Sequence, residues 1–255
     1  MSTIHAYKYT NKGWKFLKSA TTIGKAKKIE GAVPSVTTVL KMMPPVSVRT
    51  PEGFEPYGDY RMWLGGREGL NYQQTKEAMF GYRKCPETGQ MITSSDFGTL
   101  AHACMEDWAN GKDSRDNPYH DVTAGARDAV VNLLDAGSDR FCETIVGVTK
   151  AEWGGSAGSV DLLGIQDGKY VLIDYKFRQC KGRGKFYEKD LSQLSIEARW
   201  TAWMMHLDYL PRIYSICIDC DTGKAYVRKW KPEDQVKGEE IFQACRVLYK
   251  HTYKF

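Results

Sequence analysis

Two acidic residues and a lysine in the second half of the chain have types and spacing that suit metal-dependent chemistry. Asp161 ends the segment Gly158-Ser-Val-Asp161, and Asp174 and Lys176 follow in Ile173-Asp-Tyr-Lys176. Alternate side chains of a strand point to opposite faces, so Asp174 and Lys176 are expected to share one face. The opposite face is apolar or aromatic and suits packing on a core: Val171, Ile173, Tyr175 and Phe177.

A predicted hairpin brings Asp161 beside the other two residues. Strands are expected over 159–165 and 169–177, joined by Gln166-Asp-Gly168, which is typical of a tight turn. Neighbouring strands lie about 5 Å apart, so two carboxylates and one ammonium can converge. Two oxygen ligands suit Mg²⁺, which acidifies a bound water and offsets phosphoryl charge, and a lysine can orient that water. The alternative is a solvated hairpin face with a chance Asp–Lys neighbour pair.

These motifs resemble the PD-(D/E)XK nuclease superfamily, and its RecB-like exonuclease branch in particular. Three other segments agree with the Gly-x-x-Asp and Asp-x-Lys motifs: Leu100-Ala-His102-x-x-x-Glu106, Gln193, and Pro34-Ser-Val-Thr-Thr-Val-Leu40. The last is similar to a segment near the start of phage RecB-like nucleases and of the mitochondrial genome maintenance exonuclease. The motifs span residues 34 to 200, and their order is more specific than any one of them.

The resemblance implies a role for each matching residue. Asp161, Asp174, the backbone carbonyl of Tyr175 and His102 would hold Mg²⁺ or Mn²⁺, and Lys176 would be the catalytic lysine. The implied activity is exonucleolytic hydrolysis of DNA that has a free or single-stranded end, in recombination, repair or phage replication. The implied fold is a restriction-endonuclease-like core of the order α-β-β-β-α-β.

Two departures from the family pattern concern acidic residues and cysteines. The branch often has Tyr four residues after the Gln, whereas this chain has Glu197. Both Glu143 and Glu152 precede Gly158, and Glu143 is favoured as an upstream acid of the site. Some relatives hold an iron–sulfur cluster, but the C-terminal cysteines here do not reproduce that grouping, so no cluster is expected.

Other polar residues have both a functional and a structural interpretation. His102 and Glu106 are four apart on a predicted helix and face the same way, either as a metal ligand with a nearby acid or as a surface pair. Gln193 could bind phosphate, a base or a loop, or simply lie on the polar face of its helix. Four cations follow the catalytic strand and suit phosphate contact, although a solvated loop would look the same: Arg178, Lys181, Arg183 and Lys185.

The elements expected around these residues are helices followed by a β-rich half. A hairpin is predicted over 7–18, a helix capped by Ser35, a loop over 50–58, a helix over 59–82 and a loop over 85–93. Helices are expected from Ser94 or Ser95 to Asn110 and over 123–136. Strands are predicted over 141–148, 150–153, 212–218 and 225–230, and helices over 187–207 and 232–250. This order predicts an α/β class protein (α+β in its mixed sheet), with helices flanking a central mixed sheet.

The domain organisation is expected to be one compact domain. Residues 1–93 would form a helical and hairpin elaboration, and residues 94–255 the nuclease core. The chain has 255 residues, 42% of them hydrophobic, which is enough for a full core. No apolar run is long enough for a bilayer and the first residues are polar, so a cytoplasmic protein without membrane partners is expected, in the host cytoplasm if phage-encoded.

The charge and the cysteines leave alternatives open. The net charge of +5 is compatible with a polyanionic partner but does not require one. Cys217 and Cys220 form a lone C-x-x-C within an odd total of seven cysteines, which favours ordinary thiols over a redox or zinc site. The alternatives to an exonuclease are an endonuclease that uses the same site, a DNA-binding module with a subordinate nuclease site, and a C-x-x-C redox protein.

Overall fold

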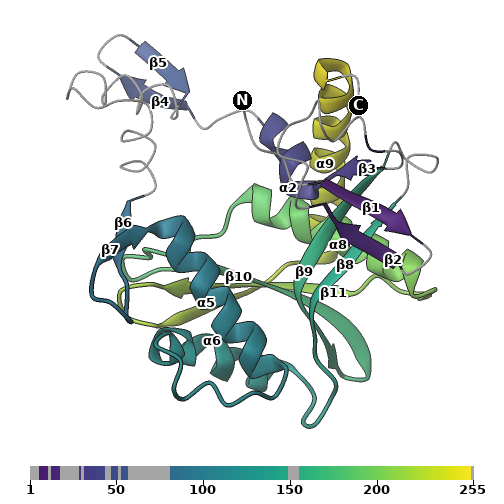
Figure 1. Ribbon diagram of the computed structural model, residues 1–255. Coiled ribbons are helices and arrows are strands. Elements are labelled where there is room, and N and C mark those ends of the chain that lie inside the picture. The colour runs from purple at the N-terminus through teal and green to yellow at the C-terminus, as the bar shows by residue number, and fades with distance from the viewer. Residues whose placement is uncertain are drawn as a thin grey trace.

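A five-stranded mixed sheet forms the centre of the protein (Figure 1). The structure is a computed structural model, and it describes residues 6–10, 13–17, 29, 32–43, 47–50, 53–56, 81–148 and 155–253. The strands of the sheet lie in the order β12-β11-β10-β9-β8. Their bounds are β8 (Phe141–Val148), β9 (Ser156–Gln166), β10 (Lys169–Arg178), β11 (Arg212–Asp219) and β12 (Ala225–Lys229). Only β10 and β11 are parallel, because the helix between them returns the chain to the same end of the sheet. The prediction of an α/β fold with a mixed sheet is confirmed.

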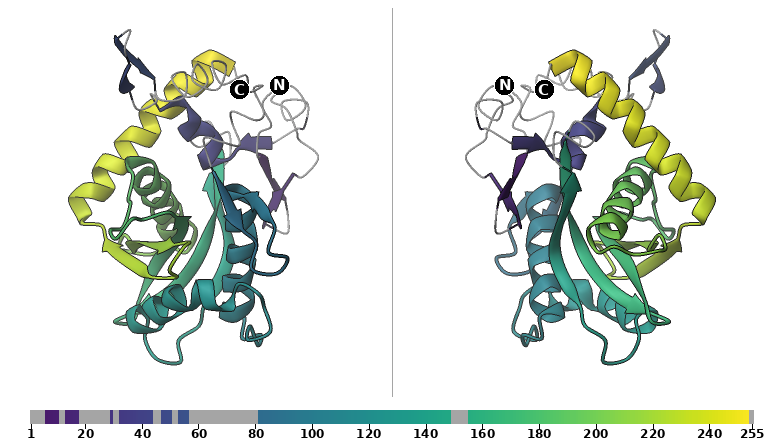
Figure 2. Two further views of the ribbon diagram at one scale, coloured as in Figure 1. Left: turned by 90° about the vertical axis from the view of Figure 1, so that its left-hand side faces the viewer. Right: turned by 90° about the vertical axis from the view of Figure 1, so that its right-hand side faces the viewer.

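Helices cover both faces of the sheet (Figure 2). Helices α5 (Ser94–Ala109) and α6 (His120–Leu133) lie on one face, and α8 (Glu188–Met204) lies on the other. Helix α9 (Pro232–Tyr253) packs on the outer side of α8. No helix in the described part of the chain has both the length and the apolar character needed to cross a lipid bilayer.

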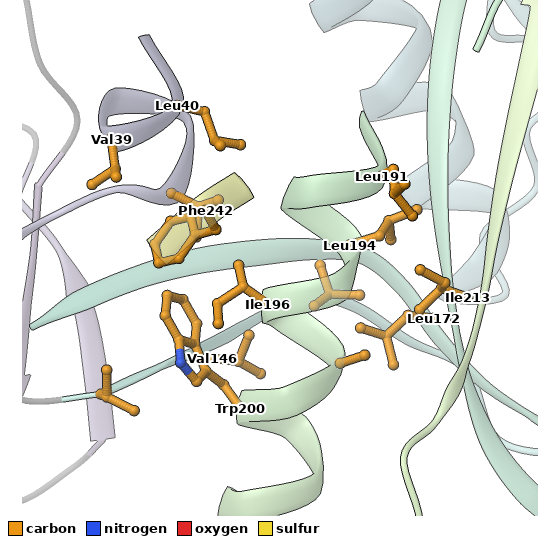
Figure 3. Packing of buried hydrophobic residues seen from close by; sticks show 14 of the residues in the cluster. Val39, Leu40, Val146, Leu172, Leu191, Leu194, Ile196, Trp200, Ile213 and Phe242 are labelled. Carbon is orange, nitrogen blue, oxygen red and sulfur yellow. The ribbon is translucent and has the colours of Figure 1, made fainter. Parts of the chain in front are cut away.

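The larger core lies between the sheet and helices α8 and α9 (Figure 3). Leu194 of α8 and Leu172 of β10 are fully buried, and the rings of Trp200 and Phe242 meet edge to face at 5.7 Å. Each fully buried aliphatic or aromatic side chain of this kind contributes about 1.5–3 kcal/mol. A second core on the other face joins α5 and α6 to the sheet through Met105, Val130, Leu162, Ile173 and Ile216.

The hairpin between β9 and β10 is confirmed with a tight two-residue turn. Asp167 and Gly168 have φ of 54° and 69°, the positive values that such turns require. The carboxylate of Asp135 accepts hydrogen bonds from both backbone N–H groups at 2.9 and 3.0 Å. This closure fixes the register in which Ile173 lies opposite Leu162.

The N-terminal segment packs on the sheet core. It contains β1 (Ala6–Thr10), β2 (Gly13–Phe16), β3 (Ala32–Pro34), α2 (Val36–Val39) and the short 3-10 helix η1 (Leu40–Met42). Ser35 caps α2 as predicted, because its hydroxyl accepts the N–H of Thr38 at 3.1 Å. Ser156 of β9 donates to the carbonyl of Pro34 at 2.9 Å, and Val36 and Leu40 belong to the larger core.

Several boundaries differ from the sequence predictions. Two hairpins, β4 (Ser47–Thr50) with β5 (Gly53–Pro56) and β6 (Tyr82–Lys84) with β7 (Met91–Thr93), occupy segments expected to be loop or the end of a helix. Strands of three or four residues show too few alternations for a pattern to be recognised. The cap of α5 is Thr93 and not Ser94 or Ser95, because the hydroxyl of Thr93 accepts the N–H of Asp96. Helix α6 begins at His120, before the expected start at residue 123. Residues 59–80 of the helix expected over 59–82, and the strand expected over 150–153, lie outside the described residues.

A candidate metal centre where two strands separate

The site lies where β9 and β10 part. Their pairing runs from Lys169 opposite Gln166 to Ile173 opposite Leu162 and ends there. Beyond that point β10 stays paired with β11, and β9 stays paired with β8. Asp174 and Asp161 are the first residues past the last pair, so the opening of the sheet falls at the two predicted ligands.

The carboxylate of Asp161 links β9 to β10 at the point where the two strands separate. Its Oδ2 atom accepts the backbone N–H of Tyr175 at 2.8 Å, a donor that the separated strand no longer pairs. The same oxygen lies 3.6 Å from Nδ1 of His102 on α5. The side chain of Asp161 is therefore held from two sides, by a backbone amide of β10 and by an imidazole.

The alternation of side chains changes at the level of Asp161. Val160 packs in the core under α8 and Leu162 in the core under α5 and α6, although a regular strand would place both on one face. The neighbouring strand changes in the same place, with Cys142 on the α5 side and Val146 on the α8 side. Glu143 lies between these two with φ of 49°, an uncommon value for a residue other than glycine.

Three potential ligands converge at this irregularity. Each of His102, Glu143 and Asp161 offers a ligand atom, and these atoms all lie within 4.8 Å of one another. The hydroxyl of Ser159 donates to Oε2 of Glu143 at 2.5 Å and orients that carboxylate. One imidazole and two carboxylates are a donor set that suits Mg²⁺ or Mn²⁺.

An open pocket of about 520 Å³ leads to these ligands. One wall is the polar side of α5, which contributes residues one turn apart: Ser95, Gly98, Thr99, His102 and Glu106. The other wall includes Glu143, Tyr175 and Lys176. Glu106, predicted to accompany His102, therefore faces the same pocket.

Asp174 is buried and forms an ion pair with Lys176, which is partly exposed and also lines the pocket. The ammonium of Lys176 donates to Oδ1 of Asp174, whereas Oδ2 of Asp174 is buried with no partner among the described residues. Burial raises the pKa of Asp174 to about 7, against the opposite effect of Lys176. Burial alone would lower the pKa of Lys176, but the carboxylates of Asp174 and Asp161 raise it above its usual value. A buried carboxylate with one free oxygen fits a bound cation.

Glu197 is a buried acid that the sequence reasoning treated only as a departure from the family pattern. It is 1% exposed, and Nε2 of Gln193 donates to its Oε1 at 3.4 Å. Burial, and then the charges of Asp174 and Asp161, raise its pKa well above the usual value. Gln193, for which contact with phosphate, a base or a loop was one alternative, thus donates to Glu197 within α8. The signal that could have found Glu197 was its place four residues after the Gln.

Of the basic residues predicted at and after the end of β10, one forms an ion pair and the others are exposed or half-buried. Arg178, expected to contact phosphate, instead forms an ion pair with Asp190 at 2.7 and 2.8 Å and donates to the carbonyl of Lys185 at 2.6 Å. Lys181 and Arg183 are exposed, and Lys185 is half-buried. Of the four cations predicted to contact phosphate, Lys181, Arg183 and Lys185 remain candidates.

The two cysteines of the C-x-x-C lie apart. Sγ of Cys217 is 3.3 Å from Sγ of Cys180, and both residues are fully buried. Cys220 packs instead against the separate cluster of Cys85, Phe97, Ala101, Cys104 and Tyr119. Their separation favours ordinary core thiols over a dithiol redox pair.

Comparison with known proteins does not assign the chain to a family. No protein-family model matches the sequence, and no curated protein sequence matches it significantly. Among solved structures, the crystal structure of SSO0001 is 15% identical and has a TM-score of 0.33, covering 65% of this chain and 72% of that one. A likeness of that size has no bearing on function.

Proposed function

We propose that this protein is a Mg²⁺- or Mn²⁺-dependent deoxyribonuclease of the PD-(D/E)XK type, with a restriction-endonuclease-like core. The observation that supports this most directly is that ligand atoms of His102, Glu143 and Asp161 lie within 4.8 Å of one another, beside a pocket that His102, Glu143 and Lys176 line. A hairpin with a purely structural role has no need for three potential metal ligands at the edge of an open pocket. The orphaned oxygen of Asp174 adds a fourth group that a cation would satisfy.

In the proposed phosphodiester hydrolysis, the residues of the centre have different roles. His102, Glu143, Asp161 and Asp174 would hold the cation, together with the carbonyl of Tyr175 that the family resemblance implies. When bound, a divalent ion acidifies water and offsets the charge that develops on the phosphoryl group. Lys176 lines the pocket with its charged form favoured by Asp174, so it supplies a fixed positive charge where a phosphate enters.

We propose exonucleolytic digestion from a free or single-stranded DNA end, in recombination, repair or phage replication, in the cytoplasm of the cell or of the phage's host. The support is the ordered set of motifs that resembles the RecB-like branch. Lys181, Arg183 and Lys185 follow the catalytic strand and would contact the DNA backbone.

A cleavage assay tests the proposal. We expect Mg²⁺ or Mn²⁺ to support digestion of an end-labelled linear DNA strand, with a covalently closed circle resistant and chelation abolishing the reaction. Asp174→Asn should cut at least ~100-fold more slowly yet still retain DNA in a mobility assay. Efficient cutting of the circle would show an endonuclease. Retention of DNA without cleavage under any of these conditions would show a binding module and reject the proposal.

A further inference from the structure

A second pocket lies between helices α8 and α9, on the opposite side of the sheet from α5 and the candidate metal centre (Figure 2). Its volume is about 350 Å³, within the roughly 300–1,000 Å³ of small-ligand sites. Val148, the last residue of β8, forms part of its wall. Among the described residues, this α8–α9 pocket has none in common with the pocket beside His102. A ligand bound there would be separate from the proposed cleavage site.

The walls of the α8–α9 pocket come from one face of each helix. Glu239 and Gln243 are four residues apart on α9 and therefore face the same way. The α8 wall consists of residues spaced three or four apart, which also share a face: Ile196, Arg199, Trp200 and Trp203. Apolar and aromatic walls with a few polar groups are typical of sites that bind small molecules.

The two tryptophans of the α8–α9 pocket differ in exposure. Trp200 is buried, and its ring meets Phe242 edge to face at 5.7 Å (Figure 3). Trp203, in contrast, is 53% exposed. An exposed indole offers a flat surface on which the ring of a base can stack. Trp203 therefore supplies a stacking surface beside a pocket whose inner wall is fixed by core packing.

Glu239 already binds a guanidinium group. Nε of Arg199 donates to both carboxylate oxygens at 3.2 Å, and Nη2 of Arg199 lies 3.2 Å from Oε1. These distances exceed the about 2.7–2.9 Å of well-formed charge-assisted hydrogen bonds. The side chain of Arg199 is 54% exposed, whereas that of Glu239 is 20% exposed. Because an exposed ion pair of this kind contributes little stability, a ligand with the same pattern of donors can take the place of Arg199.

Guanine has that pattern of donors. Its N1–H and N2–H groups lie side by side, like the two parallel N–H groups that a guanidinium presents to a carboxylate. Adenine, cytosine and thymine place an acceptor next to each donor on this edge, so one oxygen of Glu239 would face a lone pair. Once released from Glu239, Arg199 has free donors for O6 and N7 of guanine, the two acceptors that arginine recognises in DNA.

We propose that the α8–α9 pocket binds a guanine ring. Glu239 accepts N1–H and N2–H of the ring, Arg199 donates to its acceptors, and Trp203 stacks on its face. A free guanine nucleotide and a guanine base in a single strand share this chemistry. The assignment is independent of the proposed nuclease activity, because it uses no residue of the metal centre.

Isothermal titration calorimetry of the full chain with guanosine or adenosine monophosphate tests the proposal, in chelator so that no metal-dependent cleavage takes place. The guanine nucleotide should bind at least ~10-fold more tightly than the adenine nucleotide, since two hydrogen bonds to a charged group distinguish them. Glu239→Gln should weaken guanine binding at least ~10-fold, and Trp203→Ala at least ~5-fold. Glu240→Gln changes an exposed acid next to Glu239 but outside the pocket, so this matched control should bind as the unmodified protein does.

Two short single-stranded oligodeoxynucleotides, identical except that one dG is replaced by dA, identify the source of the base. Tighter binding of the dG strand than of the free nucleotide would assign the pocket to a base within a strand, and the reverse to a free nucleotide. Equal affinity for guanosine and adenosine monophosphate, or an unchanged affinity in Glu239→Gln, would overturn the proposal.

Failure of both guanine ligands to bind would also overturn the proposal, and binding of arginine amide in their place would indicate an arginine side chain of a partner protein. Circular dichroism of each variant checks that it is folded, and the preference of the unmodified protein for guanine remains decisive if a variant is not. None of these outcomes changes the expected Mg²⁺-dependent cleavage, so the two proposals stand or fall separately.

Discussion

The backbone N–H of Tyr175 donates to Oδ2 of Asp161 at 2.8 Å across the point where β10 and β9 separate. A side-chain carboxylate here replaces the ladder bond that the parting strands no longer make. The same oxygen faces the imidazole of His102, so one atom both closes the sheet locally and belongs to the candidate metal centre.

This double role makes Asp161→Asn an informative change. The amide oxygen can still accept the N–H of Tyr175, so we expect a change in unfolding free energy of under about 1.5 kcal/mol, the net value of one hydrogen bond. The lost charge should weaken Mn²⁺ binding at least ~10-fold and reduce cleavage with it. Urea denaturation and Mn²⁺ titration of the same sample check both parts. A strongly destabilised variant would mean that the main role of Asp161 is structural.

Gly158→Ala should be destabilising because its methyl group would overlap Glu197. Overpacking of this kind costs about 1–3 kcal/mol. The double variant Gly158→Ala/Glu197→Ala should be less destabilised than the sum of the two single changes, since the smaller side chain frees the space. Urea denaturation of the four proteins measures the coupling, and strict additivity would argue against the contact.

Asp190→Ala should be among the more destabilising single changes in α8. Asp190 is 4% exposed, receives two hydrogen bonds from Arg178 and also accepts the N–H of Tyr187 at the start of the helix. Removing one partner of a buried pair costs about 3–5 kcal/mol.

Glu188→Ala in the same helical turn is the control for Asp190→Ala. Its partner Lys237 and Glu188 itself are both more than half exposed, so the change should cost under ~1 kcal/mol. Thermal unfolding should rank the two variants in that order, and equal effects would refute the structural role of the Arg178 pair.

The stability of the metal-free protein should fall as the pH rises. The pKa of Glu197 is raised in the folded state, so its contribution is fully present below its unfolded pKa of about 4.3 and is lost as the pH climbs toward the folded value. Glu197→Gln should flatten this dependence above pH ~4.3. Denaturation in chelator across this range provides the check, and identical pH profiles for the two proteins would disprove it.

The exposed cations after β10 should determine part of the salt dependence of DNA binding. Replacing Lys181 and Arg183 by Gln should reduce the slope of log K against log salt by about 1.4 for single-stranded DNA, at about 0.7 for each lost phosphate contact. Lys250→Gln, exposed on α9, should leave the slope unchanged. An unaltered slope in the double variant would place the DNA elsewhere.

The sequence predicted the hairpin and the placement of its candidate ligands because their signals are local. Asp167-Gly168 specifies the turn, and alternation specifies which side chains share a face of β10. The role of Arg178 could not be predicted, because its partner Asp190 lies on a helix whose approach depends on the packing of the whole core. The burial of Glu197 could not be predicted for the same reason. The change in side-chain alternation at Glu143 could not be predicted either, because no pattern of residue types marks it.

The packing of α2 against the sheet limits how the chain can be shortened. Val36, Val39 and Leu40 are almost fully buried in the larger core, together with residues of α8 and α9. A fragment that began at Ser94 would keep every proposed ligand, but it would expose the apolar surface that Val36, Val39 and Leu40 cover. Such a fragment would tend to aggregate, so residues 36–40 are an integral part of the folding unit.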